Sequence, residues 1–125
     1  MASQSPYGAL ISSEHVEGTN VYSAAKDEKV GEIHHLMIDK RSGRVAYAVM
    51  SFGGFLGLGE SHYPVPWNAL KYDTRLEGYV TGITAEQLQN APALNDDRSY
   101  ADRDWETRLH RHYGATNYWE GGLPA

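Results

Sequence analysis

The chain has 125 residues, of which 41% are hydrophobic and 22% are charged, and it contains no cysteine. This length suits one compact domain with an appendage. Without cysteine the chain cannot form disulfides, thiolate metal sites or a thiol nucleophile. Eleven Lys and Arg residues against sixteen Asp and Glu residues give a formal net charge of −5. That charge disfavours contact with a phosphate backbone, so we do not expect nucleic acid to be the partner.

The beginning of the chain carries no targeting pattern. Residues 1–8 are rich in Ser, Gln and Pro, and we expect them to form a flexible N-terminus. They have neither the basic region nor the apolar region of a signal peptide. The longest apolar run, Val45–Met50, is far shorter than the roughly 18 residues that a membrane helix needs. We therefore expect a cytoplasmic protein that does not insert into a membrane.

Short strand-like segments separated by glycine predict a small all-β unit over residues 9–94. The predicted strands are 9–12, 20–23, 31–39, 44–52, 62–66 and 78–83. In the segment 44–52, Val45, Tyr47 and Val49 alternate with other apolar residues, so that both faces of the strand are apolar. This pattern is typical of a strand that is covered on both sides.

The strand 31–39 is predicted to be irregular. Ile33 has the wrong parity for the face that Leu36 and Ile38 share. A β-bulge near His34 and His35 would return Ile33 to the core and bend the strand. Short, strongly bent strands are what a small barrel requires.

Two prolines restrict the position of the strand 62–66. Pro64 and Pro66 cannot donate a backbone hydrogen bond, which confines their strand to a sheet edge or to ladder positions that need no N–H. Further along the chain, Thr84 and Gln87 form a capping-box pattern. It predicts a short helix that ends near residue 90, before Pro92.

Residues 95–125 have a different pattern, which predicts a helical extension and a tail. A helix is expected from about residue 100 to residue 113, followed by Gly114 at the position after its C-terminus. Its apolar stripe contains Trp105 and Leu109. A helix of about 14 residues is only marginally stable alone. We expect it to pack either on its own barrel or on another subunit.

Four motifs occur in order: V-G-E-I at 30–33, D-K-R-S-G at 39–43, S-F-G-G at 51–54 and V-P-W-N-A-L at 65–70. In these motifs the chain, over about residues 10–94, resembles the PRC-barrel family. This family includes the cytoplasmic domain of the photosynthetic reaction-centre H subunit and the C-terminal domain of a ribosome-maturation factor. It also includes small stand-alone bacterial proteins. The resemblance implies a small β-barrel that acts as an adaptor and has no catalytic residues to carry over. His35 departs from the acidic or small polar residue expected at that position.

The histidines do not predict a metal site. His34 and His35 are neighbours, so in a regular strand they point to opposite faces, although a bulge could bring them together. His110 and His112 lie about 200° apart around a helix. The glycine-rich segment 53–60 lacks the Lys-Ser/Thr of a phosphate-binding loop. We therefore expect no catalytic residues, no metal and no cofactor.

Apolar side chains outside the regular strands are the candidates for a protein interface. The alternative is that they pack within the chain: the loop residues over one end of the barrel, and Trp67 in the core or in an open barrel end. The candidates are Phe55, Leu56, Leu58, Trp67, Trp105 and Leu109.

The function expected from these patterns is a non-catalytic interaction module. It would dock on a protein partner or pair with itself, most simply as a homodimer. Three alternatives remain open at this point: a ribosome- or RNA-processing-associated factor, an accessory protein resembling the reaction-centre subunit, and a barrel that binds a small ligand.

Overall fold

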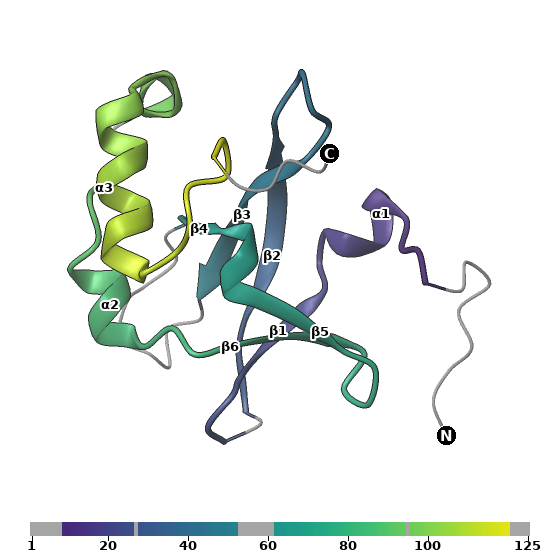
Figure 1. Cartoon of the computed structure of the whole chain (residues 1–125). Helices are drawn as coiled ribbons and strands as arrows, with labels where there is room; N and C mark the ends of the chain where they lie inside the picture. Colours follow the sequence, from purple (N-terminus) through teal and green to yellow (C-terminus); the bar gives the residue numbers. More distant parts are fainter. Residues whose placement is uncertain (1–8, 27, 53–61, 95, 121–125) are drawn as a thin grey trace.

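The computed structural model describes residues 9–26, 28–52, 62–94 and 96–120 (Figure 1). Its strands are β1 (Asn20–Ser23), β2 (Lys29–Ile38), β3 (Val45–Phe52), β4 (His62–Pro66), β5 (Leu70–Asp73) and β6 (Gly78–Thr81). Its α-helices are α1 (Ser13–Val16), α2 (Ala85–Gln89) and α3 (Arg103–Tyr113), and its 3-10 helices are η2 (Trp67–Ala69) and η3 (Asp97–Ala101).

All six strands belong to one sheet with the order β4-β3-β2-β1-β6-β5. Neighbouring strands are antiparallel, except for the parallel pair β1 and β6. The two edge strands, β4 and β5, follow each other in the chain and are joined by η2. The sheet therefore curls into a half-barrel, with α2 and α3 on one side and α1 on the other (Figure 1). A barrel-like sheet followed by helices was predicted, but with helices packed on the sheet the molecule is not an all-β protein.

The predicted β-bulge in β2 is confirmed. The pairing of β2 with β3 shifts between Ile33 and His35, and Ile33 is fully buried. A second shift, between Met37 and Ile38, was not predicted. It corrects the prediction for Ile38, which is 54% exposed and does not lie in the core.

Strand β3 is covered on both faces, as predicted. One face contributes Ala48, Met50 and Phe52 to the core inside the curled sheet. Val16 of α1 and Leu88 of α2 extend this core at its margins. A second core lies between β3 and the C-terminal helix and receives Tyr47 from the opposite face of β3; its buried members are Ala46, Tyr47, Trp105 and Leu109.

Helix α3 is positioned by its caps and by Trp105. The carboxylate of Asp102 accepts hydrogen bonds from the backbone N–H groups of Asp104 and Trp105, and Gly114 ends the helix with φ 67°. The indole N–H of Trp105 donates to the carbonyl oxygen of Ala93 at 2.9 Å. The helix predicted in this region is thus confirmed, but it begins at Arg103 because η3 precedes it.

Other predictions for single elements have mixed outcomes. The strand predicted at 9–12 is wrong, because Ser12 caps the short helix α1. Strand β5 was not predicted. The capping box of α2 is confirmed, with both hydrogen bonds between Thr84 and Gln87 present. Strand β4, with its two prolines, lies at the sheet edge as predicted. Among the described helices, none has the length and apolar character needed to cross a membrane.

Candidate functional site

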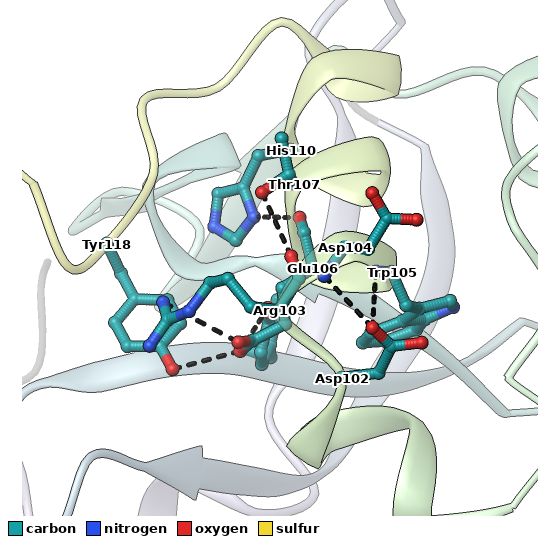
Figure 2. A network of polar contacts seen from close by, with 9 residues as sticks. Asp102, Arg103, Asp104, Trp105, Glu106, Thr107, His110 and Tyr118 are labelled. Atoms are coloured by element: carbon teal, nitrogen blue, oxygen red, sulfur yellow. Dashed lines mark hydrogen bonds and ion pairs between the residues drawn. The ribbon is translucent and has the colours of Figure 1, made fainter.

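A buried carboxylate joins α3 to the sheet and to the C-terminal segment. The hydroxyl of Tyr47 donates to Oε2 of Glu106 at 2.8 Å, and the hydroxyl of Tyr118 donates to the same oxygen at 2.9 Å. Nη1 of Arg103 lies 3.6 Å from the other carboxylate oxygen. Figure 2 shows Arg103, from α3, and Tyr118, from the segment after it, both directed toward Glu106. Because Glu106 is only 3% exposed, these three partners replace the water that its charge would otherwise need.

The local sequence explains how this network forms. Glu106 lies three residues after Arg103 and three before Leu109, so it shares the face of α3 that packs on the sheet. Tyr47 meets this face because it belongs to the second core, on the α3 side of β3. The two residues are 59 positions apart in the chain. No short-range sequence signal could therefore have paired them.

Burial and the carboxylate extend the neutral range of the two tyrosines to higher pH. The pKa of Tyr47 is raised well above its usual value, first by burial and then by its hydrogen bond to Glu106. The same causes raise the pKa of Tyr118 to about 12. Both hydroxyl groups carry their proton at neutral pH, and each already donates it to Glu106.

The C-terminal segment is held by Arg103 and by aromatic contacts. The guanidinium of Arg103 lies 3.7 Å from the centre of the Trp119 ring and 5.8 Å from that of Tyr118. His110 contacts Trp119 edge to face, with ring centres 5.3 Å apart. These contacts fix residues 118 and 119 over α3.

An open groove of about 500 Å³ lies beside the network. We call it the basic groove, because its lining contains three basic residues beside three aromatic ones. These residues are Lys40, Arg41, Arg103, Tyr47, Tyr100 and Tyr118. Met37 and Ile38 add apolar surface at the end of β2. Asp39 also lies in the lining, but its carboxylate accepts hydrogen bonds from the backbone N–H and the hydroxyl of Ser42. These bonds lower the pKa of Asp39.

A second, smaller cavity of about 220 Å³ also has Tyr118 and Ala46 in its wall. Trp67 and His110 line it together with polar residues of the C-terminal segment. Nδ1 of His110 is 2.7 Å from the carbonyl oxygen of Glu106, and since a carbonyl only accepts, Nδ1 carries the proton. Nε2 of His110 is buried and has no hydrogen-bond partner among the residues that the structure describes.

Three of the six predicted interface residues can be placed. Trp67 is half-buried and contacts Tyr79 edge to face, with ring centres 5.3 Å apart. Trp105 and Leu109 are 3% and 1% exposed. The prediction that these two residues face a partner is corrected, because β3 and the C-terminal segment of the same chain cover them. Phe55, Leu56 and Leu58 lie outside the described residues.

The bulge in β2 gathers three histidines. Nδ1 of His34 and Nδ1 of His35 are 2.7 Å apart, and the rings of His34 and His62 have centres 4.2 Å apart. The pKa of His35 is lowered by burial and then by the neighbouring His34 and His62. Within the part of the chain that the structure describes, no group of three or more His, Asp or Glu residues could hold a metal ion. That the bulge could unite His34 and His35 was foreseen, whereas the approach of His62 was not.

Comparison with protein-family models identifies the family of the strand-rich part of the chain. A family model described as PRC-barrel domain matches residues 10–88. The matched range contains all six strands and ends within α2, so it does not include α3 or the C-terminal part of the network. No curated protein matches the chain.

Proposed function

Because the chain belongs to the PRC-barrel domain family, we propose that it is a non-catalytic interaction module that docks on a protein partner through the basic groove. The observation that carries this proposal is that the carboxylates of the groove have partners within the chain, whereas two of its cations have no ion-pair partner among the described residues. Its two carboxylates, Asp39 and Glu106, are engaged within the chain. Within the described ranges, the cations of Lys40 and Arg41 are not within ion-pair distance of any carboxylate.

The network beside the groove supports a role in binding. The phenol groups of Tyr47 and Tyr118 are committed to Glu106, and their raised pKa values keep them protonated. These residues hold α3 and the C-terminal segment in place, so that the walls of the groove are rigid before a partner arrives. A preformed surface binds with a smaller entropic cost than one that must first become ordered.

The proposal is tested by site-specific photo-cross-linking in cells that express the full chain. A photoreactive amino acid replaces Ile38, which lines the groove and is 54% exposed, or Tyr72 on β5, which is 47% exposed. We expect the probe at position 38 to form a protein adduct that the probe at position 72 does not form. Equal labelling from both positions, or labelling of RNA alone, would contradict the proposal.

The mass of the cross-linked adduct shows whether the partner is a second copy of the chain. An adduct of twice the chain mass would show that a second copy occupies the groove, as in a homodimer. Light scattering on the purified chain would then report a dimer that charge reversal at Lys40 and Arg41 weakens. We further propose a bacterial, cytoplasmic setting, which rests on the resemblance to small bacterial members of the family.

A small-ligand-binding barrel is a second candidate function, favoured by the 220 Å³ cavity that His110 lines and by the buried Nε2 of His110, which lacks a hydrogen-bond partner within the described part of the chain. In the neutral ring this nitrogen accepts a hydrogen bond, which suits a small molecule with a hydroxyl donor and an apolar body. A set of small phenols and alcohols should then raise the melting temperature of the wild type but not of His110→Phe. Equal shifts in both proteins, or none in either, would rule this candidate out.

A further inference from the structure

On the basis of the proposed function, we propose that the basic groove recognises an acidic peptide segment that carries one aliphatic or aromatic anchor residue. The carboxylates of the segment face Lys40, Arg41 and Arg103. The anchor residue packs against Ile38 and the tyrosine rings of the groove.

The cations of the groove have donors left for a ligand. Lys40 and Arg41 lie between β2 and β3 and, within the described residues, form no ion pair. The side chain of Arg103 lies 3.6 Å from Glu106 and stacks on Trp119, but it is 56% exposed, so part of its guanidinium stays open to a ligand. A guanidinium and a carboxylate match in geometry, which favours Asp and Glu side chains as ligands.

The apolar part of the groove lining indicates that the ligand carries an apolar anchor residue. Ile38 is 54% exposed at the end of β2, and Met37 lies beside it in the lining. The half-buried rings of Tyr100 and Tyr118 form the aromatic part of the lining, and both pack on the buried ring of Tyr47, with ring centres 5.8 and 5.7 Å from it. The volume of about 500 Å³ is that of a site for one or two side chains. Exposed apolar and aromatic surface of this kind gains binding energy when an apolar side chain covers it.

The number of cations favours a peptide over RNA. A protein that grips a nucleic-acid backbone can contact about 6–10 phosphates, whereas the lining of this groove holds three cations together with the carboxylates of Asp39 and Glu106. The whole chain carries a formal net charge of −5, which repels a polyanion at long range. A short acidic segment can be attracted by the nearby cations alone, because at 0.1 M salt charges interact mainly within about 10 Å.

The test is a selection from a random peptide library displayed on phage, with the full chain as bait at low salt. We expect the enriched peptides to carry a net negative charge and at least one Leu, Ile, Phe, Tyr or Trp. Synthetic copies of the enriched peptides are then measured by fluorescence anisotropy. Affinity for Lys40→Glu/Arg41→Glu should be lower by about tenfold or more, and moderate salt should weaken binding to the wild type.

The matched control is Lys26→Glu/Lys71→Glu, which changes the net charge equally at exposed positions outside the groove. It should keep the wild-type affinity within about twofold, as expected for charges remote from a contact. Both double variants are checked for an unchanged urea midpoint. Enrichment of basic or neutral peptides, or no enrichment, would overturn the inference. Tighter binding of a labelled oligouridine, lost on charge reversal in the groove, would overturn it in favour of RNA.

Two further outcomes separate this inference from the proposed function. Acidic peptides that bind both double variants equally would place recognition elsewhere on the chain, which overturns the groove assignment but not the interaction role. If in addition the probe at position 38 gives no protein adduct, the proposed function fails as well.

Discussion

Glu106 shows how one side chain can join three parts of the molecule. Its carboxylate accepts hydrogen bonds from β3 through Tyr47 and from the C-terminal segment through Tyr118, while its backbone belongs to α3. A hydrogen bond to a charged group contributes about 1.5–3 kcal/mol, more than a bond between neutral groups. The loss of either phenol should therefore be measurable.

We expect Tyr47→Phe to lower the free energy of unfolding by about 2 kcal/mol, because it removes one donor from a buried carboxylate. The matched control is Tyr72→Phe, in which the hydroxyl lost belongs to a side chain that is 47% exposed. Urea unfolding followed by tryptophan fluorescence measures both changes. Similar losses in the two variants would show that the bond to Glu106 contributes nothing particular.

Stability should fall in alkaline solution because of Tyr118. Its pKa is about 12 in the folded chain and about 10 in the unfolded chain. Between these values the unfolded chain has lost the proton that the folded chain still binds, so stability decreases as the pH rises from about 10. The urea midpoint of Tyr118→Phe should decline less over this range than that of the wild type. An identical decline would contradict the contribution of Tyr118.

His35 should make the fold sensitive to acid. Its folded-state pKa lies below the ordinary value, because burial and the charges of His34 and His62 outweigh those of Glu17 and Asp97. The unfolded chain then binds a proton first, so stability falls as the pH drops from about 6.5 through the lower folded-state pKa. His35→Gln should flatten this part of the stability profile, whereas the control His15→Gln on α1 should retain it.

Residue patterns predicted local features well and long-range pairs poorly. The parity of Ile33 was sufficient to predict the bulge, because a residue must face either the core or solvent. The role of Glu106 had no such signal. A glutamate in the first turn of a helix is usually solvated, and the two tyrosines that donate hydrogen bonds to Glu106 are 59 and 12 positions away.

At the scale of elements, the pairing of β2 with β3 depends on a close approach at Gly31. A Cβ atom at this position would lie 2.2 Å from the carbonyl oxygen of Ser51, which belongs to the backbone of β3. The two strands would have to separate, and strain of this kind costs about 1–3 kcal/mol or more.

We therefore expect Gly31→Ala to lower the thermal midpoint strongly or to prevent folding. Gly82→Ala is the control, since a Cβ there meets nothing within 4 Å and its φ is not positive. That variant should be neutral or more stable by a few tenths of a kcal/mol, because alanine restricts the unfolded chain. Equal behaviour of the two variants in circular dichroism melts would refute the close approach.

The extent of burial explains the outcome for two of the strands and for the segment 9–12. Strand β3, with six of its eight residues buried, was predicted correctly. Strand β5 was missed because only Leu70 of its four residues is buried, so no alternation is visible in the sequence. The segment 9–12 was taken for a strand because of Leu10 and Ile11, which are 75% and 42% exposed. In this segment the apolar residues are not buried, so their apolar character led to a wrong prediction.

For the whole molecule, the folding unit extends beyond the family domain. The family model ends at residue 88, whereas the second core takes Trp105 and Leu109 from α3. Without these residues the α3-facing surface around Tyr47 would lose its cover. The C-terminal extension is therefore part of the stable unit.

Leu109→Ala tests this conclusion. We expect a loss of about 2–5 kcal/mol, because the variant opens a cavity at a side chain that is 1% exposed. The control Leu10→Ala removes the same atoms from a side chain that is 75% exposed and should change stability by less than about 0.5 kcal/mol. A small effect of Leu109→Ala on the urea midpoint would mean that α3 is only loosely attached.

The prolines of β4 have a consequence for the behaviour of the protein at high concentration. Pro64 and Pro66 pair with Val49 and Tyr47, and residues two apart in a strand direct their nitrogen atoms toward the same edge. Prolines are accommodated in strands where this edge faces away from the neighbouring strand. The outer margin of β4 therefore lacks donors at alternate positions. It is a poor template for the addition of further strands, which is the step by which fibrils grow.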